Sequence, residues 1–233
     1  MGDVMKKLTG YFTRFELALW FSSMAAIIAA YLIFGSGNYF TLTASLVGTG
    51  MLIFNAKGNP AGQVLAIIFS VMYAVVSYTY AYYGEMITYL GMTAPMAALS
   101  LVSWLRNPFK GKKSEVTVNK LGKKEIALML VLAAAVTVVF YFIMRALSTA
   151  NLEISTASIT TSFAAAYLTA RRSPYFGLAY AANDVVLIVM WIMATHENPS
   201  YFSVIICFIV FLFNDIYGFV NWKRMRKKQS DCI

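Results

Sequence analysis

Residues Ile126–Met144 read IALMLVLAAAVTVVFYFIM, a run of 19 residues without a charged side chain. About 20 apolar residues cross a bilayer core as an α-helix, so this run predicts a membrane-spanning helix. Seven similar runs lie on either side of it, and only the last two contain a charge, Asp184 and Asp215. They are Leu17–Phe34, Tyr39–Ala56, Ala61–Gly84, Met86–Leu105, Ile154–Ala170, Ser173–Thr195 and Pro199–Trp222. The sequence therefore predicts an all-α integral membrane protein with eight transmembrane helices.

The composition of the whole chain agrees with this prediction. Of its 233 residues, 60% are hydrophobic and 12% are charged, whereas soluble domains have about 45–50% apolar and about 25% charged residues. An ordinary soluble enzyme and a disordered chain are both excluded. The runs do not alternate between apolar and polar residues, which argues against a β-barrel. Two cysteines and one histidine show no metal-binding spacing, so we expect neither a metal nor a cofactor.

The positive charges indicate how the helices are oriented. The net charge is +9, from 19 Lys and Arg residues against 10 Asp and Glu residues. With the N-terminus in the cytoplasm, 18 of the 19 fall on the cytoplasmic side, and only Arg145 falls outside. Cytoplasmic loops of membrane proteins carry such an excess of Lys and Arg. We therefore expect a multi-pass protein of the cell inner (cytoplasmic) membrane with both termini in the cytoplasm, and no nucleic-acid partner.

Two parts of the chain resemble each other in sequence. Asn55–Pro60 (NAKGNP) matches Thr169–Pro174 (TARRSP), and Val102–Arg106 (VSWLR) matches Val220–Arg224 (VNWKR). The second to fourth helices thus resemble the sixth to eighth, and a single linking helix gives both units the same orientation. Parallel repeats of this kind occur in transporters that hold their substrate between the repeats.

The predicted organisation follows from this repeat. It has a cytoplasmic N-terminus and peripheral first helix over 1–37, a first three-helix repeat over 38–106, a basic loop and linker helix over 107–150, a second three-helix repeat over 151–223 and a basic tail over 224–233. This is a plan of one peripheral helix plus a 3+1+3 bundle.

Polar side chains inside the spans mark the candidate substrate site. A charged residue at mid-bilayer costs about 2.5–3.5 kcal/mol and normally faces the bundle interior or a water-filled cavity. Helical spacing places further amide and aromatic side chains on the same faces as the two aspartates. The predicted substrate-binding residues are Gln63, Tyr73, Tyr180, Asn183, Asp184, Trp191, Asn214, Asp215 and Tyr217. These groups suit an uncharged or cationic heteroaromatic ring with hydroxyl groups, because aromatic faces attract cations and amides bind hydroxyls.

Some single residues have a second interpretation. Ser70 and Ser77 are equally well explained as small packing residues. Trp104 and Trp222 are at least as well explained as anchors at the membrane interface. The aspartates could be structural hydrogen-bond partners, and we expect Glu85 to be solvated at the outer rim. His196 is expected to be a surface residue.

The C-terminal stretch FLFNDIYGFVNWK, residues Phe211–Lys223, and the segment Ala181–Trp191 give the chain a resemblance to the PnuC-type vitamin transporters. The main members of that family carry nicotinamide riboside. The resemblance implies a helix arrangement similar to that of the SWEET sugar transporters, and facilitated diffusion followed by trapping of the substrate by a cytoplasmic kinase. It points to Asn183, Asn214 and Trp191 as pocket residues, and more weakly to Gln63 and Tyr180.

The chain departs from the family pattern near one of these residues. Members specific for nicotinamide riboside tend to have tryptophans around the pocket asparagine of the penultimate helix. This chain has Phe176 and Tyr180 there, and Asp184 follows Asn183. Thiamine, riboflavin and deoxynucleosides, which relatives carry, therefore remain alternative substrates.

We predict a membrane transporter rather than an enzyme, which imports a nucleoside-like vitamin precursor by uniport with alternating access. Nicotinamide riboside is the preferred substrate. Proton-coupled transport through Asp184 or Asp215 is an alternative. A membrane enzyme using these aspartates as an acid–base pair lacks a supporting nucleophile motif or phosphate loop. The expected partners are the small-molecule substrate, the bilayer and a cytoplasmic substrate kinase, and homo-oligomerisation is left open.

Overall fold

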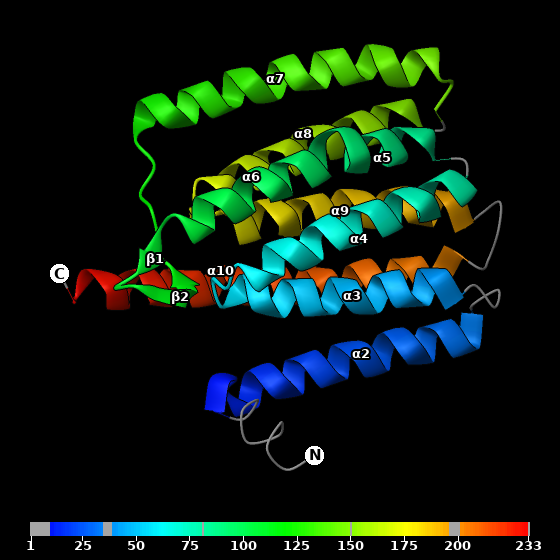
Figure 1. Cartoon of the computed structure of the whole chain (residues 1–233). Coiled ribbons are helices and arrows are strands. Elements are labelled where there is room, and N and C mark those ends of the chain that lie inside the picture. Colours follow the sequence, from blue (N-terminus) through cyan, green and yellow to red (C-terminus); the bar gives the residue numbers. More distant parts are fainter. Residues whose placement is uncertain (1–9, 35–38, 81, 150, 196–200, 233) are drawn as a thin grey trace.

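The computed structural model describes residues 10–34, 39–80, 82–149, 151–195 and 201–232. In this part of the chain, long helices lie side by side and one short hairpin packs at one end (Figure 1). The helices are α2 (Arg14–Phe34), α3 (Tyr39–Ala56), α4 (Ala61–Thr79), α5 (Tyr83–Thr88), the π-helix η1 (Tyr89–Thr93), α6 (Ala94–Leu105), α7 (Lys123–Ala146), α8 (Leu152–Ala170), α9 (Phe176–Thr195) and α10 (Phe202–Ser230). The strands are β1 (Pro108–Phe109) and β2 (Lys112–Val116). The predicted all-helical membrane fold is confirmed.

Seven segments of the described chain are helical, long and apolar enough to cross a membrane, with Tyr83–Leu105 taken as one span. The remaining predicted span, Ile154–Ala170, corresponds to α8, which is not among them because seven of its 19 residues are Ser or Thr. Several of these hydroxyls donate to the helix's own carbonyls, as Thr156 does to Leu152 at 2.7 Å and Thr169 to Ala165 at 2.8 Å. Such bonds satisfy the hydroxyls internally. Helix α8 packs between α7 and α9, with its axis alongside those of the other spans (Figure 1).

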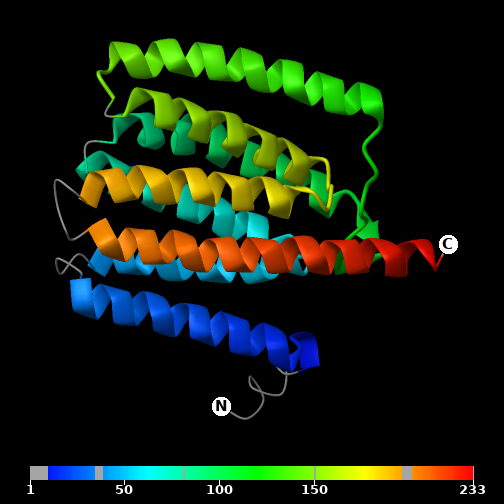
Figure 2. The ribbon, with the colours of Figure 1, turned by 180° about the vertical axis from the view of Figure 1, so that it is seen from behind.

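Six of the spans pack in a closed ring. Helix α3 contacts α4, α4 contacts α6, α6 contacts α8, α8 contacts α9, α9 contacts α10, and α10 returns to α3. Helices α2 and α7 lie outside this ring on opposite sides, α2 against α3 and α10, and α7 against α8 (Figure 2). The described chain thus has one outer helix, three spans, a linker and three further spans.

Matching hydrogen bonds join the two halves of the ring. The Nε1 group of Trp104 donates to the carbonyl of Thr169 at 2.9 Å, and that of Trp222 donates to the carbonyl of Asn55 at 2.8 Å. These are the residues that correspond in the sequence match. The preceding residues repeat the pattern, since Ser103 donates to the Ala170 carbonyl and Asn221 to the Ala56 carbonyl, both at 2.8 Å.

The indoles of Trp104 and Trp222 also contact each other, with ring centroids 5.3 Å apart. Their exposed fractions are 1% and 0%. The interpretation of these tryptophans as interfacial anchors is therefore wrong, because they close one end of the ring from inside.

The third span of the first half contains a π-turn. The sequence predicts one span over Met86–Leu105, and the structure has one continuous helical segment, Tyr83–Leu105, made of the short helix α5, the π-helix η1 and then α6 with Pro95 in its first turn. Proline has no N–H group to donate, and single π-turns inside α-helices are frequent at functional sites. The corresponding span of the second half, α10, is one continuous helix of 29 residues.

The end of the bundle that carries the hairpin also carries most of the Lys and Arg residues, and we call it the basic end. The hairpin was not predicted within the basic loop. Its turn residues Lys110 and Gly111 both have positive φ, 48° and 76°, as a tight two-residue hairpin turn requires. The Val116 N–H donates to the carbonyl of Gly58 at 3.0 Å, which attaches the hairpin to the turn between α3 and α4.

Candidate functional site

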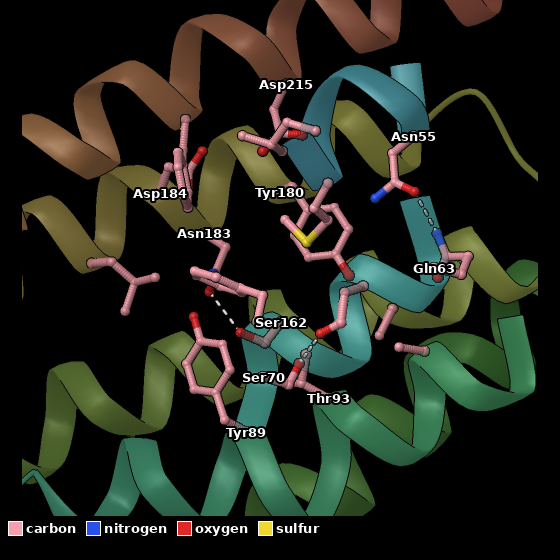
Figure 3. Close-up of a pocket in the computed structure, with 18 of the residues that line it drawn as sticks. Asn55, Gln63, Ser70, Tyr89, Thr93, Ser162, Tyr180, Asn183, Asp184 and Asp215 are labelled. Carbon is pink, nitrogen blue, oxygen red and sulfur yellow. Dashed lines mark hydrogen bonds between the residues drawn. The ribbon is translucent and has the colours of Figure 1, made fainter. Parts of the chain in front are cut away.

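A cavity lies inside the ring, between mid-span and the basic end, and every helix of the ring contributes to its wall (Figure 3). Its apolar wall includes Leu52, Phe69, Leu187, Phe208 and Phe211. Some of its polar side chains also form hydrogen bonds within the wall. The polar lining residues are Asn55, Gln63, Ser70, Tyr89, Thr93, Ser100, Ser162, Tyr180, Asn183, Asp184 and Asp215. The combination suits a ligand with a flat apolar part and several polar groups.

Five of the nine predicted site residues line this cavity. Gln63 comes from α4, Tyr180, Asn183 and Asp184 from α9, and Asp215 from α10. The three α9 residues face inward together because positions three and four apart share one face of a helix. Gln63 donates through Nε2 to Oδ1 of Asn55 at 2.8 Å, a bond between α4 and α3 that can be followed in Figure 3.

Asn183 is held in one orientation by two hydroxyl groups of α8. Its Oδ1 atom accepts hydrogen bonds from Thr161 at 2.7 Å and from Ser162 at 2.9 Å. These bonds hold the carboxamide oxygen on the side of α8. The Nδ2 group has no hydrogen-bond partner among the described residues, so it is available as a donor to a ligand in the cavity.

Asp184 and Asp215 bring two carboxyl groups together on the cavity wall (Figure 3). Their exposed fractions are 4% and 5%, and the Oδ2 atom of Asp184 has no hydrogen-bond partner among the described residues. No Lys, Arg or His side chain is among the described residues that line the cavity. Two like charges in a low-dielectric site repel each other, so this wall is built to receive a cation or a proton.

The other four predicted site residues lie outside the cavity. Tyr73 and Trp191 are buried beside it, and the indole Nε1 of Trp191 donates to the Tyr73 hydroxyl at 3.0 Å. With Tyr80, Tyr82 and Tyr201 they form an aromatic layer between the cavity and the end opposite the basic end. Tyr73 and Trp191 thus do not line the cavity but close that side of it.

Asn214 and Tyr217 face helix α2 rather than the cavity, which corrects the predicted inner face of α10. The Asn214 Nδ2 group donates to the Ser23 hydroxyl at 2.9 Å, and the Tyr217 hydroxyl donates to Glu16 Oε1 at 3.0 Å. The inner face of α10 is formed by Phe208, Phe211 and Asp215. Asn214 is rotated by about 100° from Asp215 around the helix, and α2 covers that side.

Helix α2 therefore packs through specific polar contacts. Thr13 and Glu16 form a capping box, in which the Thr13 N–H donates to Glu16 Oε2 at 2.6 Å and the Glu16 N–H donates to the Thr13 hydroxyl at 3.2 Å. The Glu16 carboxylate is buried and forms a salt bridge with Lys57 at 3.0 Å. The buried carboxylate of Glu16 is thus paired with a cation outside the ring, whereas Asp184 and Asp215 have no cationic residue beside them among the described residues that line the cavity.

Other predictions about single residues can also be checked against the structure. Glu85 is 1% exposed, so its predicted position at a solvated rim is wrong. Ser70 lines the cavity while its hydroxyl donates to the Ala66 carbonyl at 2.7 Å, and Ser77 is buried. His196 lies outside the described residues.

Sequence reasoning missed several lining residues, above all Asn55 and Tyr89. Asn55 could have been found, because it stands in the repeated segment that precedes Pro60. Tyr89 and Thr93 belong to the π-helix η1, and an α-helical projection of the sequence does not give their direction.

The cavity has a volume of about 60 Å³, which is room for a few water molecules. Pockets for small organic ligands have volumes of about 300–1,000 Å³. Side chains or helices around the cavity must therefore move apart before a nucleoside can bind. The described structure is a closed conformation of the ring.

Comparison with known proteins gave matches along most of the chain. A sequence model described as the nicotinamide mononucleotide transporter family matches residues 38–224. Proteins named nicotinamide riboside transporter PnuC match from two organisms. The one from Neisseria mucosa is 25% identical over 97% of this chain and 87% of its own length, and the one from Haemophilus influenzae is 20% identical over 83% of each.

The fold matches a solved structure. A crystal structure of the vitamin B3 transporter PnuC superposes with a TM-score of 0.80 and 21% sequence identity, covering 94% of this chain and 94% of that one. The bundle of helices seen here is thus the fold of that transporter.

Proposed function

The chain belongs to the nicotinamide mononucleotide transporter family, and from this premise we propose that it imports nicotinamide riboside by facilitated diffusion. The observation that carries the proposal is the enclosed cavity, whose wall holds amides, aromatic rings and two carboxyl groups but no described cationic side chain. The names of the two PnuC relatives support the choice of substrate.

Each part of nicotinamide riboside has a counterpart in the cavity wall. Its carboxamide and ribose hydroxyls match the amides of Asn183 and Gln63, which reject analogues that leave a buried polar group unpaired. Its pyridinium ring is flat and positively charged, so it can lie against Phe69 and Phe211 and gain attraction from Asp184 and Asp215.

The same wall argues against the phosphorylated form of this substrate. Nicotinamide mononucleotide carries a phosphate group, and a phosphate beside two carboxyl groups without a compensating cation would be repelled. We therefore propose that the nucleoside is carried, and that phosphorylation by a cytoplasmic kinase follows transport.

The route through the protein is closed on both sides of the cavity. Trp104 and Trp222 close the basic end, and the aromatic layer around Tyr73 and Trp191 closes the other. Uniport requires these two closures to open alternately, by movement of one three-helix unit against the other around the site. We propose that the basic end faces the cytoplasm, because membrane proteins concentrate Lys and Arg there.

A ligand panel tests the proposed substrate. Nicotinamide riboside, nicotinamide mononucleotide, thiamine, riboflavin and a deoxynucleoside are added to the purified full chain, and the melting temperature is measured. A true ligand stabilises the folded protein by mass action, so only nicotinamide riboside is expected to raise it strongly. A larger rise with another compound would replace the proposed substrate.

Proton-coupled uptake is a second candidate, favoured by the two carboxyl groups that share the cavity wall. Uptake into vesicles that enclose a substrate kinase separates the two mechanisms. A uniporter accumulates phosphorylated substrate at the same initial rate with and without a proton gradient. A rate that falls when the gradient is collapsed would establish coupling through the aspartates.

A further inference from the structure

A second cavity, of about 520 Å³, opens at the basic end beside α7. It is bounded by the first turns of α7, the last turn of α8, the turn that leads into α9 and the last turns of α10. None of the predicted substrate-binding residues lines it, so it is separate from the cavity inside the ring.

The residues that line this cleft are of two chemical kinds, positively charged and apolar. Lys120 and Arg226 provide positive charge, and no acidic residue is among the described residues that line it. Ile126, Met129 and Leu168 provide an apolar wall. The nearby acid Glu125 is already paired with Arg171.

The positions of these residues along the helices place the cleft at the level of lipid headgroups. The apolar run of α7 begins at Ile126, after Lys123 and Lys124, and the apolar part of α10 ends at Trp222, one turn before Arg226. The cations therefore stand where the hydrocarbon core of a bilayer ends, while Met129 and Leu168 lie deeper. Basic pockets between membrane helices at this level bind the headgroups of anionic lipids.

Helix α7 has few protein neighbours to hold it in place. Of its 24 residues, only Met129, Ala133 and Met144 are buried, and Figures 1 and 2 show it as the outermost helix on its side. It packs mainly on α8. A lipid in the cleft would add contacts between α7 and the end of α10.

We propose that this cleft is a binding site for one anionic phospholipid, with the phosphate at Lys120 and Arg226 and an acyl chain against Ile126, Met129 and Leu168. The lipid fastens the linker helix α7 to the second three-helix unit. The site does not depend on which substrate the ring carries, so it stands or falls independently of the proposed transport function.

Native mass spectrometry of the full chain in detergent tests the site, with phosphatidylglycerol or phosphatidylcholine added. We expect the protein to retain one phosphatidylglycerol at least tenfold more tightly than phosphatidylcholine. The double variant Lys120→Gln with Arg226→Gln should lose this preference. The matched control, Lys112→Gln with Lys113→Gln, removes two exposed hairpin cations outside the cleft and should keep it.

A second variant separates a lipid from a soluble anion. Ile126→Trp fills the apolar part of the cleft without changing its charge, and it should weaken phosphatidylglycerol binding. Glycerol phosphate, which has no acyl chain, should not displace phosphatidylglycerol from the wild type. The proposal would be overturned if both lipids were retained equally, or if the control variant lost phosphatidylglycerol as much as the double variant does. It would also be overturned if glycerol phosphate displaced the lipid, or if a second copy of the chain occupied the cleft in place of the lipid. Melting curves without added lipid show whether the variants are folded.

Discussion

At the basic end of the ring, α3 and α8 accept corresponding hydrogen bonds from Trp222 and Trp104, whereas around the cavity the two three-helix units carry different chemistry. Both acidic groups and Asn183 come from α9 and α10, while the first unit contributes Asn55, Gln63 and the π-helix η1. The contacts that hold the units together are thus alike in the two units, while the residues that line the cavity differ.

The third helices of the two units show the same contrast in the backbone. Helix α10 is continuous and carries Asp215 on its inner face, whereas η1 interrupts its counterpart and brings Tyr89 and Thr93 to the cavity. A π-turn shifts the register of everything that follows it. One unit therefore supplies charge from a regular helix, and the other supplies hydroxyl groups from an irregular one.

Removing a carboxyl group of the second unit is expected to have the largest effect of the changes that test this contrast. Asp184→Asn should weaken binding of nicotinamide riboside by about 100-fold, because opposite charges about 6 Å apart attract by about 2.8 kcal/mol at an effective dielectric constant of 20, and each 1.4 kcal/mol is a factor of about ten in affinity. Calorimetry should show a much smaller loss for the neutral dihydro form of the same ligand. Glu153→Gln, which changes an exposed acid of α8, is the matched control. Equal losses for both ligands would contradict a role for the charge.

Close packing within the second unit gives the next largest effect. A Cβ atom added at Gly177 would lie 2.7 Å from the Asp215 carbonyl oxygen and 2.8 Å from the Phe219 nitrogen. Gly177→Ala should thus destabilise the protein by about 1–3 kcal/mol and lower its melting temperature. At Gly91, in the first unit, the nearest side-chain atom would be 3.8 Å away, so Gly91→Ala should melt like the wild type. Equal melting of both variants would show that α9 and α10 can separate.

Two asparagines of the second unit distinguish the inside of the ring from its outside. Asn183→Ala should weaken nicotinamide riboside binding about tenfold, near 1.4 kcal/mol, because it removes a donor that faces the cavity. Asn214→Ala removes a bond to Ser23 of α2 and should leave affinity unchanged. Binding to the folded variants decides between them, and a loss of affinity in Asn214→Ala alone would reverse the assignment.

The smallest effect concerns the contacts that the two units share. Trp104→Phe and Trp222→Phe each remove one hydrogen bond to a backbone carbonyl, so each should lower stability by about 1 kcal/mol. Melting temperatures of the two variants are compared in the same detergent. Similar losses are expected, and a large loss from only one of them would show that the two units are joined unequally.

The spans could be predicted well from the sequence, but the direction of single side chains could not. Asp184 and Asp215 were placed correctly because a bilayer does not tolerate a charge that faces lipid. Asn214 and Tyr217 were misplaced because α10 is covered on two sides, by the ring and by α2. A polar side chain on such a helix can find a hydrogen-bond partner on either covered side, and hydropathy does not show which side it faces.

Single residues illustrate the same limit. Glu85 stands between two predicted spans, Ala61–Gly84 and Met86–Leu105, whereas in the structure it belongs to the span Tyr83–Leu105 and is buried where α5 packs against α4 and α8. Trp104 and Trp222 have the position in sequence that interfacial anchors have. Only the approach of the two units across the ring turns them inward.

The sequence by itself determined that this chain is a bundle of membrane helices with a repeated three-helix unit. The length of an apolar run and the position of the charges are local properties, and the bilayer requires each apolar run to satisfy its backbone hydrogen bonds as a helix. The tertiary structure decided which polar groups share one cavity, where the ring is closed, and which helices of the ring α2 and α7 pack against. Those outcomes depend on the rotation of each helix about its axis and on the register of η1, and both are set by contacts between residues far apart in the chain.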